Sequence, residues 1–136
     1  ARIITLQAIY ARELQGSNLD DTCNFMMDSN NPPSEEVLKY GKQLSNLIFM
    51  HAVEIDKLII SRSKNWDFDR ITIIDKLILR MALAEMVYVD EVPPKVSIAE
   101  GVEIAKQFST EDSSSFINGI LDSVYNEIIK GKEKTV

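Results

Sequence analysis

Residues 92–122 read VPPKVSIAEGVEIAKQFSTEDSSSFINGILD, and this stretch decides the fold class. Two consecutive prolines open it, and they stop any preceding helix because proline lacks an amide hydrogen. Apolar residues then recur at helical spacing as far as Phe108, and again from Phe116 onward. The polar residues between these two runs predict a turn. The stretch therefore predicts a pair of helices, with Ser97 and Glu100 forming a capping box at the first of them.

The rest of the chain has the same helical spacing, and no segment alternates cleanly with period two. Apolar stripes predict a first helix over 3–14, a weaker helix over 19–27 and another helix over 71–87. Between them, one continuous long helix is predicted over 34–61, with Ser34 as its cap. Together with the C-terminal pair, about six helices are expected, and the fold class is all-α.

The composition fits a single domain over residues 1–136. Apolar residues form 45% of the chain and charged residues 26%, which is ordinary for a globular protein. One cysteine, Cys23, excludes an intramolecular disulfide, and with one histidine it argues against a zinc site. No apolar run approaches the roughly 20 residues that cross a bilayer, so no membrane contact and a cytoplasmic location are expected. The chain begins at Ala1, which leaves open that native N-terminal residues are missing.

The charge and the missing motifs narrow the function. A net charge of −6 counts against a nucleic-acid binder, which is usually basic overall. There is no Walker loop, dinucleotide glycine run, HExxH or nucleophile elbow in the sequence. We therefore expect no enzyme activity, no cofactor and no metal.

Three stretches together resemble the NusB family of transcription antitermination factors. They are the stretch 92–122, the first-helix residues Arg2 and LQAIY over 6–10, and WDFDRI over 66–71. The resemblance covers most of the chain, although residues 17–61 match by helical character alone. It implies two three-helix subdomains packed around a long central helix, and no catalysis.

The resemblance also implies partners. Such factors bind single-stranded boxA RNA together with the ribosomal protein NusE. The pair joins the RNA polymerase antitermination complex and promotes read-through in ribosomal RNA operons. Some family members form homodimers that hide the RNA-binding face, and the sequence leaves monomer or homodimer open.

Matching positions in the family imply the site residues of this chain. The RNA-binding residues would be Arg2, Tyr10, Asp112 and Phe116, and the partner-binding residues would be Tyr10, Arg80 and Glu85. An arginine can contact phosphates, an aromatic ring can stack on a base, and a carboxylate can accept from a base amino group. The family's earlier N-terminal arginines are absent here, so binding by this chain alone is expected to be weak.

Each of these residues also has a structural interpretation. Phe116 and Tyr10 are in register with core positions. Asp112 suits the first turn of a helix, where a carboxylate meets the positive end of the dipole. Arg80 and Glu85 are most simply part of a solvated helix face.

The last predicted helix contains Asn118 and Gly119 in its interior. A glycine there costs about 1 kcal/mol relative to alanine. The expected reason is close approach of a neighbouring helix.

Three alternatives to the antitermination function stay open. The chain could be the NusB-like domain of an rRNA cytosine methyltransferase, although such domains tend to have an arginine where this chain has Asp122. A protein-only helical adaptor would suit the acidic charge best. The chain could also be the C-terminal domain of a longer NusB-like protein.

Overall fold

A computed structural model describes residues 2–15, 34–63 and 71–129 of the chain. Every regular element in these ranges is helical, so the all-α prediction is confirmed. The elements are α1 (Arg2–Gln15), α3 (Glu35–Met50), α4 (Ala52–Arg62), α5 (Ile73–Tyr88), α6 (Pro94–Phe108), α7 (Glu111–Val124) and the π-helical turn η2 (Tyr125–Ile129). The weaker helix predicted over 19–27 lies outside the described residues. None of the described helices is long and apolar enough to cross a membrane.

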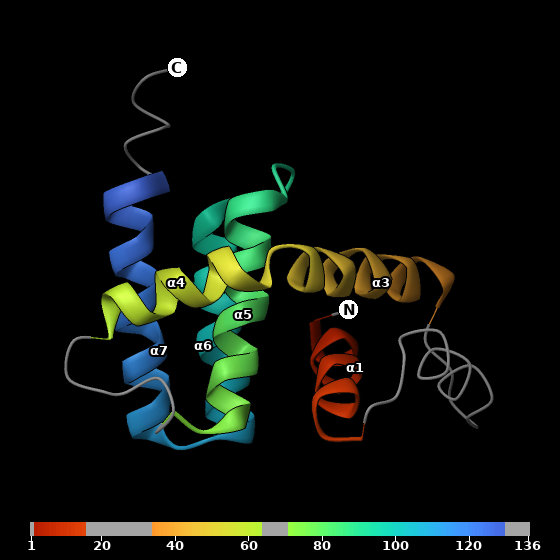
Figure 1. Ribbon diagram of the computed structural model, residues 1–136, viewed down its shortest axis with the longest axis horizontal. Coiled ribbons are helices and arrows are strands. Elements are labelled where there is room, and N and C mark those ends of the chain that lie inside the picture. The colour runs from red at the N-terminus through yellow and green to blue at the C-terminus, as the bar shows by residue number, and fades with distance from the viewer. Residues whose placement is uncertain (1, 16–33, 64–70, 130–136) are drawn as a thin grey trace.

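Helix α5 is the centre of the fold, and the other α-helices pack around it. Most of its residues are buried, which requires cover on nearly every side. Helices α6 and α7 lie beside it, α1 lies on its other flank, and α3 and α4 cross the group (Figure 1). Helices α1 and α3 on one side, and α6 and α7 on the other, are therefore joined chiefly by their packing against α5.

The helix predicted over 34–61 is bent rather than continuous. The α-helix is interrupted at His51, which has φ −112° and ψ 23° and separates α3 from α4. Backbone hydrogen bonding continues through the bend, from His51 N–H to Leu47 and from Ile55 N–H to His51. The His51 ring stacks on the Tyr88 ring of α5, with centroids 3.8 Å apart. This tertiary contact accompanies the bend, and it is invisible in the helical periodicity.

Short polar side chains cap three of the helices, and the cap at Ser34 is the one predicted above. Ser34 accepts from the amide of Val37 at the start of α3, and Thr72 does the same for Asp75 at α5. At α7, Thr110 is the corresponding cap.

The capping box predicted at Ser97 is wrong. Helix α6 begins at Pro94, with Pro93 as its N-cap, because proline at the first helical position loses no hydrogen bond. Ser97 therefore lies inside the helix, where it is buried.

Close approach of helices occurs at Gly101 of α6. A Cβ there would lie 3.2 Å from Ala82 Cβ on α5 and 3.4 Å from Leu121 Cδ1 on α7. At Gly119 a Cβ would meet nothing within 4 Å, and the residue is exposed. The predicted reason for Gly119 is therefore wrong, and the packing role belongs to Gly101.

Candidate nucleic-acid interface

Glu85 of α5 is a buried carboxylate that joins four helices. Its side chain is only 2% exposed, and Arg2 Nε of α1 donates to both of its oxygens, at 3.0 and 3.1 Å. The Tyr40 hydroxyl of α3 donates to Oε2, and Ser97 Oγ of α6 donates to Oε1 at 2.8 Å. These partners explain why a carboxylate can be buried here, since unpaired burial would cost several kcal/mol, on the order of 3 or more.

The expectation that Glu85 lies on a solvated face is wrong, because α1, α3 and α6 cover it. A direct contact between Glu85 and a partner protein would first have to open this cluster. Burial and the hydrogen bond to Glu85 also raise the pKa of the Tyr40 hydroxyl above its ordinary value. The cluster holds Arg2, whose side chain remains 26% exposed, at the start of α1.

Arg80 lies on a different side of α5 from Glu85. Its Nε and Nη2 donate to the two carboxylate oxygens of Asp56 on α4, at 2.8 and 3.1 Å. Its side chain is 15% exposed, so this bidentate pair holds α4 against α5 at the edge of the core. The predicted partner-binding residues Arg80 and Glu85 are therefore not brought together, and Arg80 is less exposed than a solvated face implies.

Tyr10 borders an apolar hollow between α1, α5 and α6. The hollow has a volume of about 260 Å³, and its lining is Leu6, Gln7, Tyr10, Ile74 and Phe108. Phe108, at the last position of α6, is 51% exposed. Tyr10 itself is half-buried, and its side chain packs against the core.

Asp112 and Phe116 border a second hollow, at the start of α7. It has a volume of about 230 Å³, and its lining is Ile71, Thr72, Asp75, Thr110, Asp112, Ser113 and Phe116. Asp112 is exposed and Phe116 is half-buried against the core. Asp75 is 5% exposed and accepts a hydrogen bond from Ser109 Oγ at 2.9 Å.

The two hollows belong to the same end of the molecule, where α5 begins, α6 ends and α7 begins (Figure 1). Ile74 lines one and Asp75 lines the other, so the first turn of α5 separates them. We call this surface the aromatic end, defined by Tyr10, Phe108, Asp112 and Phe116. It brings together three of the four predicted RNA-binding residues. Arg2 lies eight residues from Tyr10 along α1, or about 12 Å of helix.

Two residues that line the hollows were not among the predicted site residues. Phe108 was predicted only as the end of a helix, and its helical spacing does not show that the ring is 51% exposed. Asp75 falls inside the helix predicted over 71–87, and nothing in its spacing signals that Ser109, 34 residues away, supplies its partner.

The NusB family profile matches residues 1–126. The chain belongs to the NusB family. A curated relative, the transcription antitermination protein NusB of Chloroherpeton thalassium, is 39% identical over 127 residues. That match covers 93% of this chain and 60% of the relative, so the chain spans about three fifths of the relative's length.

Solved structures of NusB proteins share the fold. A crystal form of T. maritima NusB aligns with a TM-score of 0.81 and 28% identity, covering 93% of this chain and 88% of that chain. Antitermination factors NusB and NusE in complex with double-stranded RNA give a TM-score of 0.80 and 23% identity, covering 92% of each chain. The second likeness concerns the fold alone, because the identity is low.

Proposed function

We propose that this chain acts as a transcription antitermination factor. It would bind single-stranded boxA RNA together with the ribosomal protein NusE, join the RNA polymerase antitermination complex in the cytoplasm and promote read-through in ribosomal RNA operons. Membership of the NusB family and the antitermination relative support this role. The observation that carries it is the aromatic end, where an exposed acid and three aromatic rings border hollows on one surface.

The aromatic end has the chemistry to select bases. The Phe116 ring, half-buried at the mouth of a hollow, is held in place by the core and can stack on an unpaired base. The Asp112 carboxylate, one turn earlier on α7, can accept a hydrogen bond from a base amino group. Tyr10 borders the neighbouring hollow and offers a second ring, with a hydroxyl for RNA or protein contact.

Arg2 would supply phosphate contact away from the bases. Glu85 fixes its Nε, so the guanidinium is held in one place at the start of α1. Glu85 is then a positioning residue for Arg2 rather than a direct contact with NusE. Arg80 remains a candidate for partner contact through the part of its side chain that Asp56 leaves exposed.

The net negative charge of the chain explains why RNA binding would need a partner protein. With a net charge of −6, long-range attraction to RNA is unfavourable, and a single arginine contributes little. A partner that adds cationic surface and contact area beside the aromatic end would offset this deficit. Residues 1–136 would act as one domain without catalysis, with a homodimer as the competing assembly that hides the RNA-binding surface.

The test is a fluorescence-anisotropy titration of a boxA-like single strand, with and without NusE, across a salt series. We expect sequence-preferring binding that is stronger with NusE and weaker at high salt. The Phe116→Ala variant should lose about 5- to 100-fold in affinity, as the loss of one stacked base predicts. Light scattering on the same samples reports whether a homodimer competes.

A matched control separates the site from the fold. Val53→Ala removes an exposed apolar side chain from α4, remote from the aromatic end, and should leave RNA affinity unchanged. Equal binding of a scrambled strand, or equal losses in both variants, would contradict the proposed site. No RNA binding even with NusE would favour a protein-only adaptor.

A further inference from the structure

Helix α4 has an exposed apolar stripe on its outer side. The helix packs on α5 and α7 at one face of the molecule (Figure 1), and its inner side buries Ile55 and Ile59. Val53 and Ile60, two turns apart on the opposite side, are 63% and 54% exposed. Met50, at the end of α3, is exposed as well. Three of the five exposed large apolar side chains in the described part of the chain are therefore clustered here rather than scattered over the surface.

One acid and one base accompany the stripe. Glu54 and Lys57 are both exposed and lie one turn apart. Within the described residues, neither forms an ion pair with another residue. The other two charged residues of α4, Asp56 and Arg62, are already paired with residues of α5 and η2. The outer side of α4 therefore presents two apolar side chains and two opposite charges that the described part of the chain leaves unused.

The order of these four residues is complementary to itself in reverse. Val53 and Ile60 are equally distant from the point between residues 56 and 57. If two copies of α4 lie antiparallel with a two-fold axis at this point, Val53 of each copy meets Ile60 of the other. Glu54 of each copy then lies about 3 Å along the helix axis from Lys57 of the other, within reach of an ion pair. At about 100° per residue both charges lie on the same flank of the stripe, and antiparallel helices bring identical flanks together.

From this self-complementarity we infer that α4 is the interface of a symmetric dimer of this chain. A two-fold dimer uses the same patch of both copies, so each apolar contact and each ion pair occurs twice. A partner helix with charges of one sign would satisfy only Glu54 or only Lys57, whereas a second copy satisfies both. One pair of short helices buries less area than a standard interface, so the dimer is weak and forms at micromolar or higher concentrations.

The α4 dimer is compatible with RNA recognition. None of the residues that line the two hollows of the aromatic end belongs to α4. This dimer therefore differs from a homodimer that hides the RNA-binding surface, and it would carry two such surfaces. The inference does not rest on the proposed function, because only residues of α4 carry it.

Sedimentation velocity of the full chain, from about 10 μM to about 1 mM protein at about 0.15 M salt, measures the association. We expect an equilibrium between monomer and dimer. Ile60→Ser should weaken it about 10- to 50-fold, because each dimer loses the apolar contact twice. Val96→Ser is the matched control, since it removes an exposed apolar side chain from α6, and it should change the dissociation constant by less than about twofold. Circular dichroism checks that both variants remain folded.

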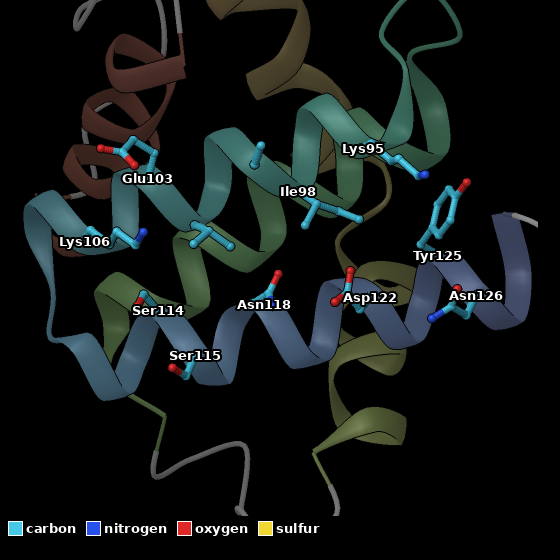
Figure 2. A pocket seen from close by; sticks show the side chains of 12 residues that line it. Lys95, Ile98, Glu103, Lys106, Ser114, Ser115, Asn118, Asp122, Tyr125 and Asn126 are labelled. Carbon is cyan, nitrogen blue, oxygen red and sulfur yellow. The ribbon is translucent and has the colours of Figure 1, made fainter.

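Charge reversal tests the pairing itself. Glu54→Lys and Lys57→Glu each replace two attractions by two repulsions, so each should weaken the dimer about fivefold. The double variant restores opposite charges at both places and should return the dissociation constant to within about twofold of the wild type. As controls, Glu103 and Lys106 repeat the same spacing on α6, where both line an open groove (Figure 2). Reversal of either control residue should change the association by less than about twofold.

Three outcomes would overturn the inference. They are a monomer at every concentration up to about 1 mM, a dimer that Ile60→Ser leaves intact, and a double reversal as weak as the single ones. In NMR spectra of the full chain, the methyl signals of Val53 and Ile60 should shift with protein concentration. A dimer that survives the α4 substitutions but dissociates on addition of boxA-like RNA would be the assembly that hides the RNA-binding surface. Failure of boxA binding would leave the association results unchanged, so the two proposals are tested separately.

Discussion

The seam between α5 and α6 and the exposed surface of α7 both contain acidic residues and a glycine, and the two regions use them in opposite ways. In the seam, Glu85 is buried among hydrogen-bond donors and Gly101 lets the helices approach. On α7, Asp112 is exposed and Gly119 faces open space. The same residue types therefore hold the fold together in one region and leave a surface available in the other.

The two regions differ because neighbouring helices cover α5 on nearly every side but leave one side of α7 open. The periodicity of a helix does not specify how many of its sides are covered. A helical pattern places Glu85 away from the first apolar stripe of α5, and this position would be solvated on a two-sided helix. Helix α5 is covered on nearly every side, so its less apolar positions are buried too and need polar partners. Helix α7 lies at the edge of the molecule, and its polar positions remain exposed.

The largest expected difference between the regions is in the free energy of unfolding. Glu85→Ala should lower it by about 3 kcal/mol, because Tyr40 and Ser97 lose their buried acceptor and Arg2 loses its counter-charge. Since Arg2 is partly exposed, its own contribution is at the low end. Asp112→Ala should cost only about 0.5 kcal/mol, the value of an exposed acid near a helix N-terminus.

Urea denaturation followed by circular dichroism gives both values. Glu85→Gln is the control, because it keeps the size and an acceptor oxygen but removes the charge, and it should lie between wild type and Glu85→Ala. Equal losses in Glu85→Ala and Asp112→Ala would mean that the buried cluster contributes no more than an exposed acid.

The two glycines sharpen the same comparison with a smaller effect. Gly101→Ala should destabilise by about 1–2 kcal/mol, because Ala82 Cβ, fixed to the backbone of α5, cannot move away from the added methyl group. Gly119→Ala should stabilise by about 0.5–1 kcal/mol, because the methyl group meets nothing and alanine favours the helix. Thermal unfolding of the two variants should therefore shift in opposite directions. Two shifts in the same direction would contradict the assignment of the packing role to Gly101 alone.

The helices themselves follow from the sequence, because their causes are local. Apolar spacing placed α1, α5 and α7, and the caps Ser34 and Thr72 act within three residues of themselves. One error came where a distant residue takes part, and the other came from a local signal, the start of a helix at a proline. The bend at His51 accompanies a ring from α5, and Ser97 belongs inside α6 because Pro94 already starts that helix.

The candidate site also has a part that local sequence predicts and a part that depends on tertiary packing. Asp112 and Phe116 lie one turn apart on α7, so a motif can predict them as a pair. Their neighbourhood with Tyr10 depends on the packing of α1 against α5, which no local pattern specifies.

The last comparison concerns the pH dependence of stability, to which the Tyr40 hydroxyl at Glu85 contributes. Burial and the hydrogen bond to Glu85 raise the pKa of Tyr40 in the folded protein, whereas an unfolded tyrosine keeps a pKa of about 10. The stability from this group is therefore fully present below pH of about 10 and is lost as the pH rises through the folded pKa. One such group changes the free energy of unfolding by at most about 1.4 kcal/mol per pH unit.

Urea denaturation at several pH values from 9 to 11 should thus show a steeper loss of stability in the wild type than in Tyr40→Phe. Burial raises the pKa of Tyr88 as well, and a charge on Glu54 adds to it, so Tyr88→Phe removes a separate part of the slope. The two losses should add, because the rings belong to different contacts, one at Glu85 and the other at His51. If the pH dependence of stability were the same in Tyr40→Phe as in the wild type, the Tyr40 hydroxyl would be as accessible to water in the folded chain as an exposed residue of α7. The contrast between the two regions would then not extend to proton binding.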